Sequence, residues 1–108
     1  MGSKWEDFID NLKDDAGTLA KGELKDLING AKDDAEEFLK EQGKKMEGYL
    51  TQLAGGEIKK DQFESYMIDI KDLTEMKALQ MEVAAKARAQ KIVNGITSLI
   101  IDGLLKLI

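Results

Sequence analysis

The chain has 108 residues, contains no histidine, cysteine or proline, and carries a formal net charge of −5. Without histidine or cysteine, Cys–His and Ser–His–Asp catalysis, zinc fingers and thiolate clusters are excluded, and without proline no residue forces a helix to stop. Charged residues make up 34% of the chain, which suits long solvated helix faces. We expect one acidic domain, residues 1–108, that does not bind nucleic acid.

The N-terminal part begins with a helix-start pattern. Ser3 is followed by Glu6, the spacing of a capping box in which each side chain accepts a hydrogen bond from the other residue's backbone N–H. Apolar residues then recur at three- and four-residue intervals, which is the periodicity of one helix face. They are Trp5, Phe8, Ile9, Leu12, Ala16, Leu19 and Ala20. No long apolar run follows Lys4, so we expect no signal peptide and a cytoplasmic location.

The same periodicity continues through residues 24–53. Glycines lie inside this stretch, and each costs about 1 kcal/mol relative to alanine in a helix interior. The helix therefore either breaks near Gly17–Gly22 and again at Gly30, or continues, with the glycines allowing a neighbour to approach closely. The unbroken phase favours a continuous helix after Glu23. The tetrapeptide Lys-Asp-Asp-Ala at residues 13–16 recurs at residues 32–35, but this echo is too short to indicate a repeat.

The clearest boundary is Gly55-Gly56, because two glycines directly after a periodic helix are typical of a helix end and a turn. A second helix start is expected at Asp61. Residues 76–91 are rich in good helix formers, so the second helix is expected to continue through them. Asn94-Gly95 is a possible stop, but the apolar residues before and after it share one face. We therefore favour a helix that continues, with or without a kink.

These elements predict an all-α fold. Its long amphipathic helices form either an antiparallel helical hairpin or a four-helix bundle, with a turn near Gly55-Gly56. Hairpin arms of about 50 residues would be about 75 Å long and would bury only one stripe of each helix. Such a hairpin would dimerise or fold back at Gly17–Gly22 and Asn94-Gly95. In the hairpin register, Trp5 would face Leu104 and Leu105.

The segment of residues 92–108 is the strongest interaction signal, because ten of its seventeen residues are Ile, Val or Leu. They cover more than one helix face, and such a segment must be buried on several sides. We expect it to be the core strip of a bundle or an interface with a second copy or another helical protein. The expected interface residues are Ile92, Ile96, Leu99, Ile100, Leu104 and Leu107.

Acidic side chains are the abundant groups with site chemistry. Glu6, Asp10 and Asp14 stand four residues apart, and such a column is either a solvated helix face or a contact for a basic partner. Adjacent acids such as Asp33 and Asp34 diverge by about 100° on a helix, so one pair cannot chelate an ion. We expect no metal, no cofactor, no small-molecule substrate and no enzymatic activity.

Four methionines stand at helical positions and are either core filler or an adaptable binding surface. They are Met46, Met67, Met76 and Met81. Core filler is the simpler expectation, since methionine fits irregular gaps between helices.

The sequence thus predicts a non-enzymatic helical interaction or oligomerisation protein that acts through apolar helix faces, with a homodimer as the simplest assembly. The alternative is a peripheral lipid- or membrane-surface-binding protein that uses residues 92–108, helped by Lys86, Arg88 and Lys91. That segment is too short and too interrupted to span a bilayer, which takes about 20 apolar residues. The three cations do not share one helix face, which weighs against the membrane alternative.

Overall fold

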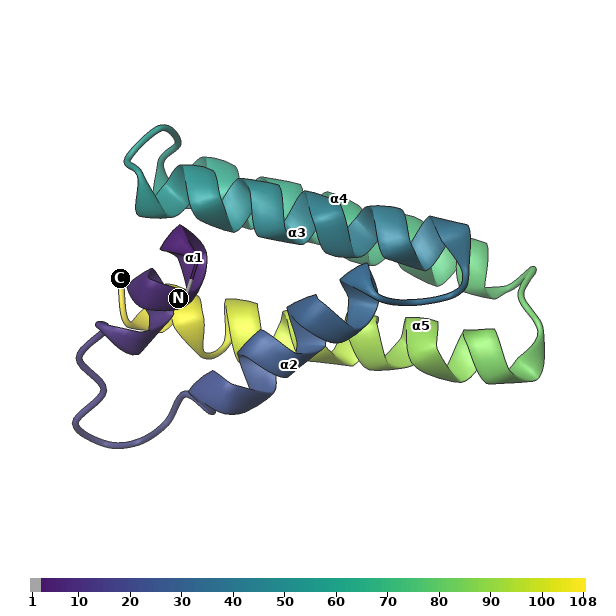
Figure 1. Ribbon diagram of the computed structural model, residues 1–108, viewed down its shortest axis with the longest axis horizontal. Coiled ribbons are helices and arrows are strands. Elements are labelled where there is room, and N and C mark those ends of the chain that lie inside the picture. The colour runs from purple at the N-terminus through teal and green to yellow at the C-terminus, as the bar shows by residue number, and fades with distance from the viewer. Residues whose placement is uncertain (1–2) are drawn as a thin grey trace.

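The computed structural model describes residues 3–108, which form five α-helices and two short helical segments of other types (Figure 1). Met1 and Gly2, which belong to the predicted single domain, lie outside the described residues. The elements are α1 (Lys4–Asp10), α2 (Lys21–Lys32), α3 (Glu37–Ala54), α4 (Lys60–Ala78), α5 (Val83–Gly95), the π-helical segment η1 (Ile96–Ile101) and the 3₁₀ turn η2 (Leu104–Lys106). The prediction of an all-α fold is confirmed.

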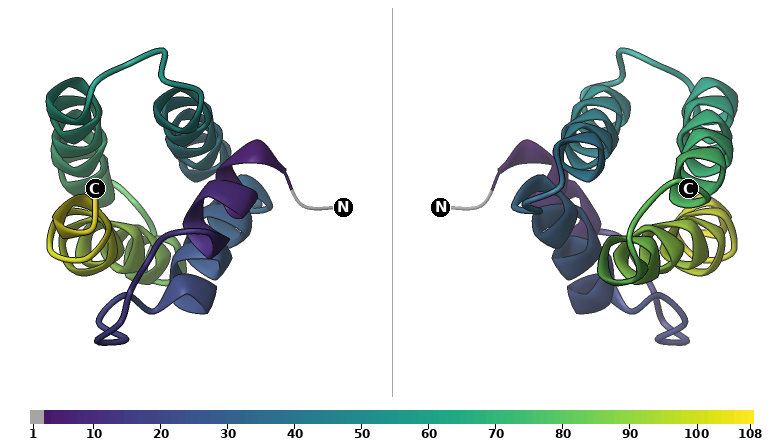
Figure 2. Two further views of the ribbon diagram at one scale, coloured as in Figure 1. Left: turned by 90° about the vertical axis from the view of Figure 1, so that its left-hand side faces the viewer. Right: turned by 90° about the vertical axis from the view of Figure 1, so that its right-hand side faces the viewer.

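The four longer helices pack as a bundle, and the short helix α1 covers the end that holds both termini (Figures 1 and 2). Helix α3 packs between α2 and α4, and α5 with η1 packs against α4. The longest extent of the molecule is 39 Å. Of the two predicted arrangements, the structure is therefore a bundle, and not a hairpin with arms of about 75 Å. The expected fold-back at Asn94-Gly95 is wrong, because the chain turns instead at residues 33–36 and 79–82.

The predicted turn at Gly55-Gly56 is confirmed. Helix α3 ends at Ala54, and Gly56 has a φ of 75°, a left-handed conformation that glycine adopts without steric cost. Helix α4 begins at Lys60, one residue before the expected start, and its first turn is capped where the Gln62 side chain accepts a hydrogen bond of 2.9 Å from the Lys59 N–H.

The prediction of a continuous helix after Glu23 is wrong. Helix α2 runs through Gly30 and ends at Lys32, and α3 begins at Glu37. Between them the Asp34 carboxylate accepts a hydrogen bond of 2.8 Å from the Glu36 N–H. The Glu36 carboxylate in turn accepts one of 3.3 Å from the Phe38 N–H. These side chains satisfy the N–H groups at the start of α3, which is what lets a new helix begin without proline or glycine.

A second correction concerns the N-terminal helix. Helix α1 begins at the predicted capping box, where the Glu6 N–H donates to Ser3 Oγ at 3.4 Å, but it ends at Asp10. The chain then forms a loop that ends before Lys21, so the break starts well before the expected Gly17–Gly22. Within the loop Gly17 has a φ of 64°. Continuity over residues 76–91 is also wrong, because α4 ends at Ala78 and α5 begins at Val83.

The C-terminal helix continues past Asn94-Gly95, as favoured, but it does so by widening into the π-helical segment η1. The Asp102 N–H donates to the Thr97 carbonyl at 2.9 Å, a bond to the fifth preceding residue that defines this wider helix. Gly95 does not break the helix. It leaves room for Leu27 of α2, whose Cδ2 lies 2.5 Å from the position that a Cβ would take.

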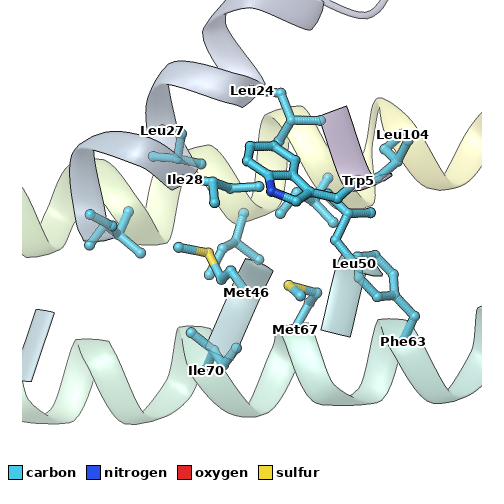
Figure 3. Close-up of a cluster of buried hydrophobic side chains, with 14 of the residues drawn as sticks. Trp5, Leu24, Leu27, Ile28, Met46, Leu50, Phe63, Met67, Ile70 and Leu104 are labelled. Carbon is cyan, nitrogen blue, oxygen red and sulfur yellow. The ribbon is translucent and has the colours of Figure 1, made fainter. Parts of the chain in front are cut away.

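The core lies between all the helices and contains the tryptophan at the end near α1 (Figure 3). Trp5 is 1% exposed, and its indole N–H donates to Glu47 Oε2 at 3.1 Å, so the buried ring keeps a polar partner. Lys32 also pairs with this carboxylate. Met46 and Met67 are buried core filler, as expected. Trp5 and Leu104 lie in one cluster, although the predicted hairpin is not formed.

Candidate functional site

The residues expected at an interface lie largely inside the chain's own core. Ile92 is 4% exposed, and Ile96, Ile100 and Leu104 have no exposed surface. Leu99 and Leu107 are half-buried. Residues 92–108 thus include a core strip, one of the two expected roles, and an interface there stays a prediction for which Leu99 and Leu107 retain accessible surface.

A large hollow in the described part of the chain is a groove between α2 and α5. It has a volume of about 630 Å³, and a second hollow of about 160 Å³ continues from it. Both hollows are lined by Asp26, Leu27 and Lys91, so they form one surface, which we call the α2–α5 groove. It extends from Ser98 of η1 to the ion pair of Asp34 with Arg88.

One close contact between α2 and α5 lies beside the groove. There the Leu27 side chain, 7% exposed, reaches the bare backbone of Gly95. Most other side chains that line the groove are polar or small, and the large apolar ones are Leu99 and Ile92. The α2 wall carries Glu23 and Asp26, and the α5 wall carries Lys91. The two walls therefore have opposite charge.

One end of the groove is closed by an ion pair. The Arg88 guanidinium donates to both oxygens of Asp34, with Nε–Oδ2 at 2.8 Å and Nη2–Oδ1 at 3.1 Å. The Asp34 side chain is 7% exposed, and this burial by itself would raise its pKa. The two bonds from Arg88 and the bond from the Glu36 N–H outweigh burial and hold the pKa of Asp34 below its usual value. Hydrogen bonding to Asp34 in turn raises the pKa of Arg88.

The π-helical segment η1 forms one end of the groove floor through Leu99. Such segments occur often at functional sites. Here the hydroxyl groups are engaged with the helix itself, since Ser98 Oγ donates to the Asn94 carbonyl at 2.9 Å and Thr97 Oγ1 to the Val93 carbonyl at 3.3 Å. The groove therefore presents charged walls and an apolar floor.

A second surface is apolar and lies at the end of the bundle away from both termini (Figure 1). Met76 is 65% exposed, Leu79 77% and Val83 87%. We call these three residues the apolar turn. The expectation that Met76 fills the core is wrong, because α4 ends two residues after it and no helix covers the turn. No glycine or proline marks this break, so the sequence pattern missed Leu79 and Val83.

The acidic column of Glu6, Asp10 and Asp14 is not formed, because α1 ends before Asp14. Asp10 pairs with Lys25 at 2.7 Å. Asp14 folds the following loop by accepting hydrogen bonds from the N–H groups of Leu19 at 2.7 Å and Thr18 at 3.0 Å. The Leu19 bond is the main reason that the pKa of Asp14 lies below its usual value. These acids thus serve local structure and not a shared docking face.

Within residues 3–108 no helix is long and apolar enough to cross a membrane, and no group of three or more acids is placed to hold a metal ion. Comparisons with known protein families, curated proteins and solved structures find no match for this chain. Its two distinctive surfaces, the α2–α5 groove and the apolar turn, are therefore the features from which its function is to be inferred.

Proposed function

We propose that the protein is a non-enzymatic helical interaction module that binds another protein through the apolar turn. The observation that supports this most directly is the exposure of Met76, Leu79 and Val83, all above 60%, next to a core that buries most other large apolar side chains. Monomeric proteins rarely leave such side chains clustered in water, and apolar patches of this kind are typical of interaction sites.

The composition of the apolar turn favours a protein partner. Methionine and leucine are flexible, so they adapt to an apolar surface on another molecule. The first turn of α5 adds the exposed small residue Ala84, which lets a partner helix approach closely. An apolar centre of this kind with charged residues around it is the usual layout of a protein–protein interface.

Binding to a membrane surface is the second candidate, and the exposed lysines Lys77 and Lys86 beside the apolar turn are the observation that favours it. The expected lipid-binding segment, residues 92–108, would have to leave the core to reach a membrane, since Ile96, Ile100 and Leu104 have no exposed surface. The acidic α2–α3 connection lies at the same end of the bundle as the apolar turn and would repel anionic headgroups (Figure 1).

The decisive variant is the triple substitution Met76→Ser, Leu79→Ser and Val83→Ser, with Ile68→Ser as the matched control. Ile68 is also apolar and exposed, at 39%, but lies further back on α4. Immobilised wild-type chain and both variants would be incubated with lysate of the source cells, and the retained proteins compared by mass spectrometry. We expect a partner that the wild type and Ile68→Ser retain and the triple variant loses by at least about tenfold.

Retention of the same proteins by the triple variant would overturn the proposal. Vesicles of phosphatidylcholine and phosphatidylserine test the second candidate, and co-sedimentation of the wild type but not of the triple variant would favour it. Circular dichroism checks that the variants fold, which is expected because the substituted side chains are exposed. The cytoplasmic location expected from the sequence stays a prediction, which cell fractionation would test.

A further inference from the structure

The walls of the α2–α5 groove carry opposite charges that are not neutralised within the chain. Glu23 and Asp26 stand on the α2 wall, and Lys91 stands on the α5 wall. All three side chains are exposed. Within residues 3–108 none of them forms an ion pair, whereas Arg88 and Asp34 at the end of the groove are paired with each other. The groove therefore presents one acidic ridge and one basic ridge to an approaching molecule.

We propose that a second copy of this chain docks on the α2–α5 groove, with a two-fold axis that runs along the groove. Rotation about that axis places α2 of one copy over α5 of the other, and the symmetry repeats the contact. Each acidic ridge then faces a basic ridge. A two-fold interface requires a surface that is complementary to itself, and opposite charges on the two sides of the axis meet this requirement.

The other two-fold arrangement is disfavoured by the same charges. An axis that crosses the groove would place α2 over α2 and α5 over α5, so that Glu23 and Asp26 face acids and Lys91 faces a lysine. Like charges brought together across an interface are repulsive. The charge pattern thus selects both the partner and its orientation.

The space between the ridges suits close approach of another helix pair. Ala87 lines the α5 side, and Gly30 lines the α2 side with no atom within 4 Å of the position that its Cβ would take. Leu99 and Leu27 form an apolar floor. Of the expected interface residues, Leu99 and Ile92 line the groove. Because apolar surface is limited here, we expect a weak dimer that depends on salt concentration.

The residues of this dimer interface differ from those of the apolar turn, so the dimer can be tested independently of the proposed function.

The test exchanges the charges of one ridge at a time. The acid-ridge variant, Glu23→Lys with Asp26→Lys, gives a chain with two basic ridges. The base-ridge variant, Lys91→Glu with Gln90→Glu, gives a chain with two acidic ridges. Gln90 also lines the groove and is exposed, so both variants change surface side chains only.

Sedimentation velocity of the purified chains would measure self-association at about 0.05 M and 1 M salt. We expect a wild-type dimer at low salt that weakens at high salt. Each variant alone should associate at least about tenfold more weakly, because like ridges meet. An equimolar mixture of the two variants should restore the dimer as a heterodimer. Two matched controls should dimerise like the wild type: Lys86→Glu, which removes an α5 lysine outside the groove, and the triple variant of the apolar turn.

Several outcomes would overturn the proposal. A wild-type chain that stays monomeric at about 1 mM would contradict the dimer, because this concentration lies well above the dissociation constants of specific weak complexes. The groove would then be free to bind a different protein. Separate variants that dimerise as strongly as the wild type, or a mixture that fails to associate, would show that the two ridges do not face each other. If the triple variant of the apolar turn kept its partner while the ridge variants behaved as expected, the proposed function would be wrong and the proposed dimer would still hold.

Discussion

The two sides of helix α2 pack in different ways. Toward α3 the backbones touch, since a Cβ on Gly43 would lie 2.5 Å from the Lys32 nitrogen and 2.7 Å from the Ala31 carbonyl carbon. Toward α5 only the tip of Leu27 reaches Gly95, and a groove of about 630 Å³ remains beside it. The same helix is therefore closely packed on one side and borders an open groove on the other.

The side chains of α2 account for this difference. Leu24, Ile28 and Ala31 are at most 4% exposed and face the core. Glu23 and Asp26 remain exposed on the groove wall. Burying apolar area stabilises by about 25 cal/mol per Å², whereas burying a carboxylate without a partner is unfavourable. The core side of α2 is therefore closed by packing, and its groove side stays open.

The largest expected effect is a difference in the free energy of unfolding between substitutions at two neighbouring residues of η1. Ile100→Ala should lower the free energy of unfolding by about 2–5 kcal/mol, because Ile100 has no exposed surface and its loss leaves a cavity. Leu99→Ala should cost about 1 kcal/mol, because the half-buried Leu99 borders the groove. Urea unfolding followed by circular dichroism measures both. Equal losses would mean that the groove side of this segment is packed as tightly as the core side.

The second prediction compares the two contact glycines. Gly43→Ala should destabilise the chain by about 2 kcal/mol, because the new Cβ meets backbone atoms of α2 that move only if the helix moves. Gly95→Ala should stay within about 1 kcal/mol of the wild type, since Leu27 can turn into the groove and alanine favours the helix. Thermal unfolding of the two variants side by side provides the measurement. A larger loss for Gly95→Ala would contradict the contrast between the two sides of α2.

The sequence predicted the helical class, the capping box at Ser3, the turn at Gly55-Gly56 and the passage of the C-terminal helix through Gly95. These features depend on neighbours along the chain, where periodicity and capping act directly. The break after α1, which was expected too late in the chain, and the missed break after α2 share a sequence signal. Lys-Asp-Asp-Ala lies within the first break, at residues 13–16, and begins at the last residue of α2 in the second, at residues 32–35.

In each tetrapeptide one aspartate folds back on the chain. Asp14 accepts from the N–H groups of Thr18 and Leu19, and Asp34 accepts from that of Glu36. Short acidic side chains compete with helix hydrogen bonds in this way. The apolar periodicity of the sequence does not change at the break after α2, because α2 and α3 both turn their apolar faces to one core. Periodicity therefore gave no sign of this break.

The candidate sites were harder to predict from the sequence than the fold. The groove depends on which helices become neighbours, and Asp26 lies opposite Lys91 only because the bundle brings together residues far apart in the chain. The apolar turn depends on where α4 ends, and Leu79 and Val83 have the same periodicity as a buried face. Residues 92–108 were correctly expected to need burial. The number of apolar side chains, however, does not indicate whether they are buried by other helices of this chain or by another chain.

The smallest expected effect concerns the ion pair that closes the groove. Asp34→Asn should lower the free energy of unfolding by about 1 kcal/mol at neutral pH, because the bond to Arg88 loses its charge. The pKa of Asp34 is held below its usual value in the folded chain. Its stabilisation is therefore complete above the pKa of the unfolded chain, about 3.9, and is lost as the pH falls through the folded pKa.

Urea unfolding at about pH 7 and again near pH 3 tests this sign, since the second value lies below the pKa of an unperturbed aspartate. The difference in the free energy of unfolding between the wild type and Asp34→Asn should be smaller at the lower pH. Asp33→Asn is the matched control, because Asp33 is an exposed neighbour that forms no ion pair within residues 3–108. A gap that widens on acidification would mean that Asp34 is not held ionised by Arg88. The groove would then lack the ion pair that closes one of its ends.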